Sequence, residues 1–290
     1  MPWYAFAFSS AILLAFAAVL EKKILFKEHA TSFAATFAAL NGLFGLILLP
    51  YVEFGVLSGR VVFLIYSAAV VDSLAFLFFI KGLRHLEVSY VAPMMAIGPA
   101  ITAILAFFLL GETLVINQAL GIGLLALGAI ILQLRVTTSP FSARVLFPPA
   151  KYMHAVIISL ALYGAGSIFD RLILAHYGIP PETFVFFGNI FIAINLLLVA
   201  ILFYNGFADI RLVVRRSWIA VFFVGILMLG QRLAEVHAIS IASVGLVVAL
   251  KRTSALFTAF LGGELFNEDH FWLHVVAAII MVAGAAFVVF

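Results

Sequence analysis

Two adjacent basic residues, Lys251 and Arg252, lie near the middle of a long apolar stretch, residues 243–262. A cation at the centre of a bilayer costs about 2.5–3.5 kcal/mol on insertion scales, so it needs a counter-charge, water or a ligand. A guanidinium group can bind a carboxylate or a phosphate through two hydrogen bonds. The pair therefore predicts an anion-binding site. The alternative left open is neutralisation by buried carboxylates such as Asp72 or Asp170.

Other polar residues in apolar surroundings are candidates for the same site. Asp72, in the middle of YSAAVVDSLAF, would act either as a proton-binding carboxylate or as a fixed counter-ion to Lys251 or Arg252. Both interpretations remain open, and they do not exclude each other. Four uncharged polar residues are predicted to line a cavity around the charged ones: Tyr90, Tyr163, Asn41 and Asn189.

Two acid–base pairs occupy matching places in the chain, Glu21–Lys22 and Asp170–Arg171. Neighbouring positions on a helix point about 100° apart, so the two members of each pair must find different partners. We expect either two gates at opposite mouths of a pathway or basic side chains that extend to the membrane interface. A third group, spaced one helical turn apart, predicts an internal ion pair: Gln231, Arg232 and Glu235.

Residue patterns for catalysis or metal binding are weak. His270 and His274 stand four residues apart but lack the HExxH form, and an interfacial helix start explains them better. Ser167 with His154 or Asp170 fits no recognised nucleophile motif. With no cysteine in the chain, disulfides and thiolate metal sites are excluded. We expect no enzyme activity, no cofactor and no metal; an intramembrane enzyme is the remote alternative.

Composition identifies the elements that position these residues. The chain is 66% hydrophobic and only 10% charged, whereas about a quarter of the residues of a soluble protein are charged. Its apolar stretches are each about 20 residues long, the length of a membrane-spanning helix. We expect an all-α integral membrane protein with ten transmembrane helices, at residues 3–25, 32–52, 61–80, 89–110, 116–134, 153–175, 183–204, 218–239, 243–262 and 271–290.

The two halves of the chain resemble each other. FFLLGETL, ending the fourth stretch, matches AFLGGELF, ending the ninth, with Glu112 and Glu264 in corresponding places. VLEKKIL matches IFDRLIL, and ATSF matches PETF, in the same order. We therefore predict a five-helix unit at 1–135, a connector at 136–151 and a second unit at 152–290. An odd number of helices per unit makes the repeat inverted.

Residues around these repeats are given packing roles and an orientation. We expect Glu112 and Glu264 to cap or pack helix ends, and Gly121, Gly123 and Gly128 to permit close helix packing. Most lysines and arginines follow the odd-numbered stretches, so these loops are predicted to be cytoplasmic and both termini outside. A prokaryotic inner membrane is the expected location.

The duplicated LLGETL and LGGELF, each followed by a glycine-bearing helix, resemble the drug/metabolite transporter superfamily, and the whole chain is similar to its ten-helix EamA branch. This resemblance implies a central cavity and transport of a small metabolite or drug. Lys251 and Arg252 also resemble a Lys–Arg pair in triose-phosphate translocators, where the pair holds phosphate. The sequence departs from those relatives at 89–110, which contains no lysine.

The leading hypothesis is a secondary transporter for a small anionic metabolite, phosphorylated or not, that works by alternating access. The alternative is an exporter of amino acids or cationic drugs on the same fold, with Lys251 and Arg252 neutralised internally and Asp72 facing the substrate. The expected partners are a small-molecule substrate, a coupling proton or counter-substrate, and the lipid bilayer. No feature favours nucleic acid, and the oligomeric state is left open.

Overall fold

The structure is a computed structural model of the 290-residue chain. It describes residues 2–25, 30–85, 94–133, 150–203, 206–258, 261 and 271–289. Within these ranges it leaves out the side chains of 22–25, 30–35, 37, 80, 83–85, 132–133, 150–151, 203, 206–217 and 271–274. The connector 136–151 almost entirely, together with Tyr90, Glu264 and His270, lies outside the described residues, as do the side chains of Lys22 and His274.

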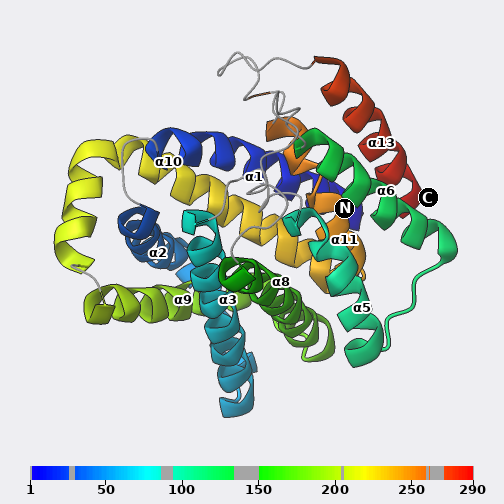
Figure 1. Ribbon diagram of the computed structural model, residues 1–290. Coiled ribbons are helices and arrows are strands. Elements are labelled where there is room, and N and C mark those ends of the chain that lie inside the picture. The colour runs from blue at the N-terminus through cyan, green and yellow to red at the C-terminus, as the bar shows by residue number, and fades with distance from the viewer. Residues whose placement is uncertain are drawn as a thin grey trace.

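Helices make up almost all of the described part of the chain, which contains no strand. Each of the ten predicted ranges contains a described helix (Figure 1). The longer helices are α1 (Trp3–Leu25), α2 (Ala30–Gly45), α3 (Gly59–His85), α5 (Gly98–Leu110), α6 (Ile116–Gln133), α8 (Ala150–Arg171), α9 (Pro181–Phe203), α10 (Gly206–Ile241), α11 (Val244–Lys251) and α13 (Phe271–Val289). Short 3-10 segments, η1 (Leu46–Tyr51) and η2 (Phe54–Val56), follow α2, and a π-helical turn, η3 (Leu172–His176), follows α8.

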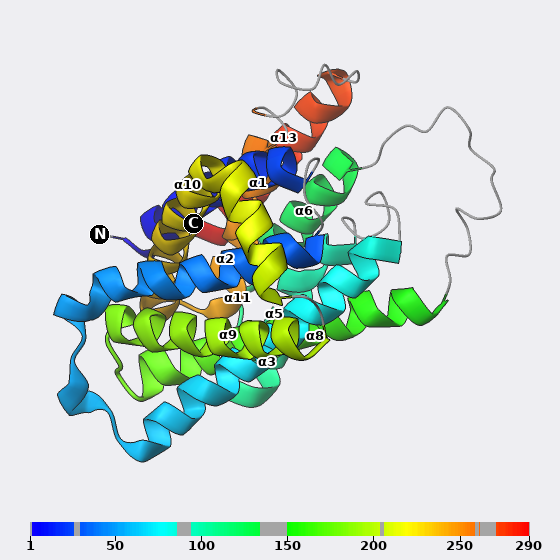
Figure 2. The same cartoon turned by 90° about the vertical axis from the view of Figure 1, so that its left-hand side faces the viewer.

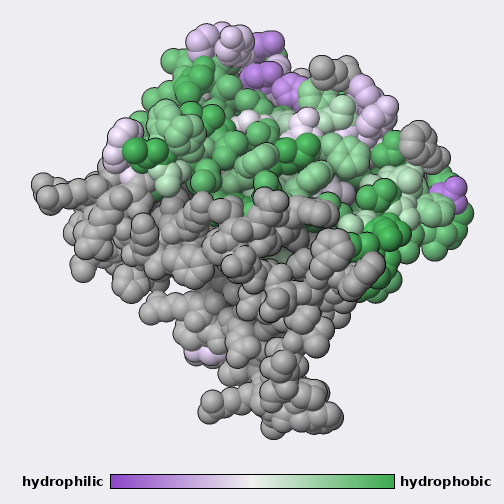
Figure 3. Space-filling view, turned by 90° about the horizontal axis from the view of Figure 1, so that it is seen from above, coloured by the Kyte–Doolittle hydropathy of each residue, from purple (hydrophilic) through white to green (hydrophobic). Residues whose placement is uncertain are grey.

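Five described segments are long and apolar enough to cross a membrane: Trp3–Glu21, Gly59–Phe79, Tyr152–His176, Pro181–Leu202 and Trp218–Ile241. Four shorter apolar helices accompany them: Ala38–Tyr51, Met94–Leu110, Ile116–Ile131 and Val275–Val289. Large apolar side chains point outward from these helices; Phe63 is 67% exposed and Phe108 is 75% exposed. Hydrophobic residues cover most of the described part of the face in Figure 3. Lipid is the environment in which such a surface is stable.

The helices pack mainly across the two halves of the chain. α1 lies along α10, and α3 lies along α8. α2 packs on α9 (Figure 2), and α6 packs on α13 at one side of the bundle (Figure 1). α5 contacts both α8 and α11 in the middle. Residues that are distant in sequence are therefore brought together in the centre.

Glycines set the close approach of α6 and α13. A Cβ added to Gly121 would lie 2.8 Å from the carbonyl oxygen of Gly284, and one added to Gly128 would overlap the side chain of Met281. The expectation of close packing is confirmed at these two positions. It is wrong at Gly123, where an added Cβ would meet nothing within 4 Å. Gly123 is exposed on the outer side of α6, away from this contact.

Two helices predicted as continuous are interrupted. In 89–110 a turn at Ile97 interrupts the helix before α5 begins at Gly98, because Pro99 has no N–H group and its ring opposes the preceding turn. In 243–262, α11 ends at Lys251, and a tighter turn follows in which Ala255 N–H donates to the Arg252 carbonyl at 3.0 Å. The Thr253 hydroxyl also donates to the Leu250 carbonyl at 2.8 Å, a local bond that competes with the regular helical pattern.

The eighth helix differs in length from its prediction. α10 begins at Gly206 rather than at residue 218, so it includes Arg211, Arg215 and Arg216, which were predicted to lie in a loop. Arginine has a high helix propensity, and these three residues lie beyond the apolar part of the helix. Hydropathy alone therefore marks the membrane-crossing part, Trp218–Ile241, and not the whole helix.

Candidate functional site

Five charged side chains from four helices meet in the middle of the bundle, and we call them the central cluster. Asp72 comes from α3, Asp170 from α8, Arg232 and Glu235 from α10, and Lys251 from the end of α11. Apolar helices carry each of these residues, so the charges lie among apolar side chains. Three carboxylates and two cations share this space.

Arg232 is the hub of the central cluster. Its Nη1 lies 2.9 Å from Asp170 Oδ2 and its Nη2 donates to Asp170 Oδ1 at 3.1 Å, which is a two-point guanidinium–carboxylate pair. The same guanidinium lies 3.7 Å from Glu235 Oε2 and 3.8 Å from Asp72 Oδ2. Asp170 is almost fully buried, with 3% of its side chain exposed. Removing Arg232 would therefore leave three carboxylates with too little positive charge.

Glu235 uses both of its oxygens. Lys251 Nζ donates to Oε1, and Gln231 Nε2 donates to Oε2 at 2.8 Å. Gln231 also donates to the Ser10 hydroxyl at 3.0 Å, which links α10 to α1. Lys251 is thus paired inside the protein, as the alternative to anion binding requires. Its partner is Glu235 rather than the Asp72 or Asp170 suggested by the sequence.

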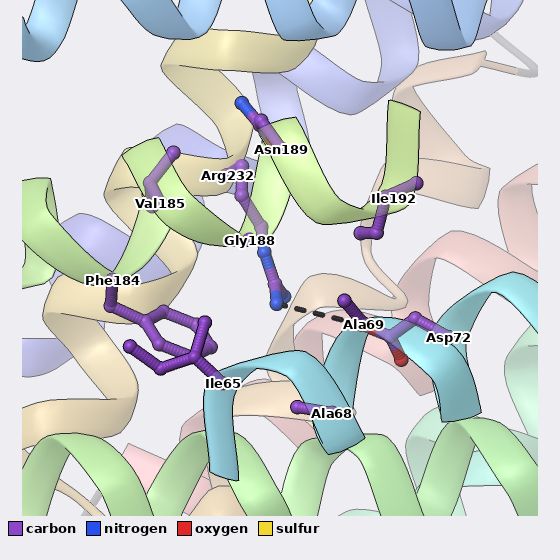
Figure 4. A pocket seen from close by; sticks show the side chains of 10 residues that line it. All are labelled: Ile65, Ala68, Ala69, Asp72, Phe184, Val185, Gly188, Asn189, Ile192 and Arg232. Atoms are coloured by element: carbon purple, nitrogen blue, oxygen red, sulfur yellow. Dashed lines mark ion pairs between the residues drawn. The ribbon is translucent and has the colours of Figure 1, made fainter. Parts of the chain in front are cut away.

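Asp72 lines a cavity between α3 and α9. Figure 4 shows Asp72 and Arg232 approaching each other at this cavity, with Asn189 and Gly188 on the wall formed by α9. At 3.8 Å the contact with Arg232 is an ion pair without a hydrogen bond. The aromatic ring of Phe184 covers the guanidinium, with its centroid 5.7 Å from Arg232 Cζ. Asp72 and Asn189 both line this cavity, but the Asn189 side chain points away from Asp72, toward Gly45 of α2.

Arg252 lies at the point where the two interrupted helices meet. A Cβ added to Gly98, the first residue of α5, would lie 2.8 Å from Arg252 Nη2, so the end of the Arg252 side chain packs directly against this glycine. Arg252 Nε is buried and has no hydrogen-bond partner among the described residues. Tyr163 of α8 lies within electrostatic reach of both Arg252 and Asp72. Unlike Lys251, Arg252 retains a donor for another group.

A second polar group joins helix ends, and we call it the end cluster: Glu112, Arg171, Ser243 and Val244. Arg171 Nε donates to Glu112 Oε1 at 2.8 Å. The Ser243 hydroxyl and the Val244 N–H donate to Glu112 Oε2 at 2.6 and 3.2 Å. Arg171 Nη1 also donates to the carbonyls of Ile239 and Ser240, at 2.6 and 3.1 Å. One carboxylate thus caps α11 while its cationic partner caps α10.

The remaining predicted residues are less closely grouped. Asp170 and Arg171 reach different partners, as adjacent helix positions require. Glu21 is half-buried on α1, and Asn41 lies on α2, which packs on α9.

Sequence reasoning missed the pair between Glu182 and His237, whose Oε1 and Nε2 lie 3.3 Å apart. It also missed the pairing of Arg171 with Glu112, although the duplication of Glu112 as Glu264 was a signal.

Comparison with known protein families decides the broad identity. The model of the EamA-like transporter family matches residues 1–134 and 150–290, on either side of the connector. The chain belongs to this family. It is therefore a multi-pass membrane protein of the drug/metabolite transporter superfamily, as its resemblance implied.

Comparison with solved structures supports the fold of this EamA-like transporter. The crystal structure of another protein aligns with this chain with a TM-score of 0.77 and 16% sequence identity. The alignment covers 98% of this chain and 95% of the other. At this identity the likeness shows the fold alone. None of the curated proteins compared with the chain matches it.

Proposed function

We propose that this EamA-like transporter is a secondary transporter that moves a small metabolite with an anionic group across the membrane by alternating access. The observation that carries this proposal is Arg252. Its Nε is buried without a partner in the described part of the chain, and its Nη2 faces the first residue of α5. The N-terminus of a helix carries a partial positive charge, so two positive features meet at one place. An anion is the ligand that such a place binds.

The pairing of the neighbouring Lys251 supports the choice of Arg252 as the anion-binding residue. Lys251 donates to Glu235, whereas Arg252 points to the break before α5. The five charges of the central cluster sum to one negative charge when all are ionised, and Arg252 adds the cation that balances them. An anion bound at Arg252 would leave the central cluster negative again. A coupling proton on Asp72 or a cationic group on the solute would restore the balance.

A second candidate substrate is a cationic or zwitterionic solute such as an amino acid. The observation that favours it is the weak pairing of Asp72, which lines the cavity at 3.8 Å from Arg232 while Asp170 and Glu235 hold their cations more closely. In this case the positively charged group of the solute would contact Asp72. The two candidates differ in which charge of the protein the solute engages: Arg252 beside Gly98 in the first, and Asp72 at the cavity in the second.

The helix packing supports an inverted repeat. Exchanging each helix of the first half for its counterpart in the second turns the pair α1–α10 into the pair α8–α3, and both pairs are closely packed. The pairs α2–α9, α5–α11 and α6–α13 join counterparts to each other. The two breaks, at Ile97 and after Lys251, also fall in counterpart helices. In inverted-repeat transporters the substrate site lies between the halves, near discontinuous helices.

The test is a thermal-shift screen of the purified protein against phosphorylated sugars, organic acids, amino acids and organic cations. We expect anionic compounds to raise the melting temperature of the unmodified protein and to have no effect on Arg252→Gln. Asp72→Asn should keep the response to simple anions and lose any response to cations and amino acids. A melting temperature raised by cations alone, in the unmodified protein and in Arg252→Gln, would refute the anionic proposal.

We also propose the prokaryotic inner membrane as the location, with the connector on the cytoplasmic side and both termini outside. The basic residues that follow the first, third, fifth, seventh and ninth predicted stretches support this orientation. Because the chain has no cysteine, Ser142→Cys is a single reporter within the connector. It should react with a membrane-impermeant maleimide only in inverted vesicles. Labelling of this cysteine in intact cells would contradict the proposed orientation and place the connector outside.

A further inference from the structure

The end cluster joins parts of the chain that come from both halves. Glu112 follows α5 in the first half, and Arg171, Ser243 and Val244 belong to the second half. Gly111, in the left-handed conformation with a φ of 67°, ends α5 and turns the chain so that Glu112 points back toward α8. Glu112 N–H is fixed in this turn by a 3.3 Å bond to the Ala106 carbonyl.

The cap on α11 is unusual because a distant residue provides it. Ser243 occupies the N-cap position, where a serine hydroxyl ordinarily accepts a bond from its own helix. Here the hydroxyl makes no such bond and instead donates to Glu112, 131 residues away in sequence. A cap confined to α11 would hold that helix end in any conformation. A cap supplied by Glu112 holds it only while the two halves are together at this end.

Both sides of the end cluster lead directly to the central cluster. Arg171 follows Asp170, the closest partner of Arg232. α11 begins at Val244 and ends at Lys251, so about 12 Å of helix separates the cap from the central charges. The π-helical turn Leu172–His176 follows Arg171 directly. Such turns are rare in proteins, and those that occur are often found at functional sites.

The strength of the pair suits a contact that opens. The side chains of Arg171 and Glu112 are 21% and 15% exposed, which makes the pair less buried than Asp170 and Glu235, at 3% and 5%, and similar to Arg232 and Lys251, at 24% and 22%. Fully exposed ion pairs contribute about 1 kcal/mol or less, and a partly exposed pair such as this one is easier to open than a fully buried pair. Moderate differential binding energy at the central site is enough to break a contact of this size.

We infer that the Glu112–Arg171 pair is a gate: it closes one mouth of the transport pathway, and a shift of α11 when solute binds beside Lys251 and Arg252 releases it. This inference rests on the proposed alternating-access function. Glu112 then controls access, beyond capping a helix end. With the pair formed, this mouth is closed; with the pair broken, the cavity that Asp72 and Gly188 line opens to the same side of the membrane.

The experiment uses one cysteine in the cavity as a reporter of access. Gly188→Cys suits this purpose, because the residue lines the cavity and an added Cβ would meet nothing within 4 Å. The rate of reaction with a membrane-impermeant maleimide is measured in intact cells and in inverted vesicles. Ile192→Cys, from the same helix and also at the cavity, serves as a second reporter if the first lowers expression.

Glu112→Gln separates a gate from a cap. The amide oxygen still accepts from Ser243 and Val244, but the negative charge that holds Arg171 is lost. We expect Glu112→Gln to raise the labelling rate at least threefold from one side of the membrane and not from the other, with an unchanged melting temperature. Arg171→Gln should give the same increase, and the double variant should add little to either because one interaction is removed in each case.

Arg60→Gln is the matched control. Arg60 is an exposed cation at the start of α3 whose guanidinium lies 5.6 Å from the ring of Tyr177, and its removal should leave labelling unchanged. If the reporter in Glu112→Gln is labelled at the wild-type rate from both sides, the inference that this pair is a gate is refuted. If Glu112→Ala then lowered the melting temperature, Glu112 would be a cap only. Failure of the proposed transport function is distinguishable, since it would abolish the ligand-induced thermal shift in the unmodified protein.

Discussion

The pair α6–α13 and the central cluster stabilise the same bundle by different means. Between α6 and α13, Gly121 faces Gly284 and Gly128 faces Met281, so the two backbones approach closely. Between α3, α8, α10 and α11, charged side chains meet instead, and Arg232 holds Asp170 at two points. Small-residue contacts in a membrane depend on van der Waals packing and leave no charge unpaired.

This difference separates a scaffold from a working part. At Gly121 and Gly128 the contact between α6 and α13 leaves no room for an added methyl group. The central cluster contains one arginine within 4 Å of three carboxylates, so its pairing can change without leaving any of them in lipid. We therefore expect substitutions in the first region to change stability alone, and those in the second to change stability and transport together.

The largest effect is expected for Arg232→Met. The substitution removes the only close cation of Asp170 among the described residues and leaves three carboxylates near one lysine. Breaking a buried ion pair by removing one partner costs about 3–5 kcal/mol. Thermal unfolding in detergent should show a large drop in melting temperature. If the added change Asp170→Asn restores the melting temperature, the pair is confirmed. An unchanged melting temperature in Arg232→Met would show that the central cluster does not stabilise the fold.

Lys251→Met should have the next largest effect. Glu235 would lose its lysine and keep only the bond from Gln231 and the more distant Arg232. An unsatisfied buried partner costs about 1–3 kcal/mol, and more when it is charged. Adding Glu235→Gln should recover much of the melting temperature. No recovery would mean that Lys251 stabilises the fold through a different contact.

Gly121→Ala tests the scaffold. The added methyl group would lie 2.8 Å from the Gly284 carbonyl, and overpacking of this kind costs about 1–3 kcal/mol. Gly123→Ala, on the same helix, meets no atom within 4 Å and should be neutral or stabilise the helix by up to about 1 kcal/mol. Both variants should transport normally at a temperature where they are folded. Equal melting temperatures for the two would contradict the close contact.

Arg252→Lys should have the smallest effect on stability and a clear effect on binding. Arg252 Nε has no partner to lose in the described part of the protein, so the melting temperature without ligand should change little. A lysine cannot reproduce the two-point contact of a guanidinium with a carboxylate or phosphate. We expect at least a tenfold loss of affinity for the best anion of the thermal-shift screen. A large loss of stability with unchanged affinity would make Arg252 structural.

Local patterns predicted the helices and their environment, because both depend on residues close together in the chain. The apolar stretch at 3–25 became α1 with the same bounds, and the chain proved to belong to the family that its duplicated GE motif resembled. Hydropathy was less informative about interruptions. The stretch 243–262 is apolar on both sides of Lys251, and the break there depends on bonds such as that from Thr253 to Leu250.

The sequence by itself determined that this protein crosses a membrane and that a few charges must lie inside the spans, and its duplicated motifs predicted two related halves. Only the tertiary structure decided how those charges are divided. Lys251 and Arg252 are adjacent and both basic, yet one meets Glu235 and the other meets the start of α5. The physical reason is that a charge in an apolar helix must pair with whatever another helix brings within a few ångströms. Which partner each charge meets depends on how the helices pack against each other, and this cannot be predicted from the residues next to the charge in the sequence.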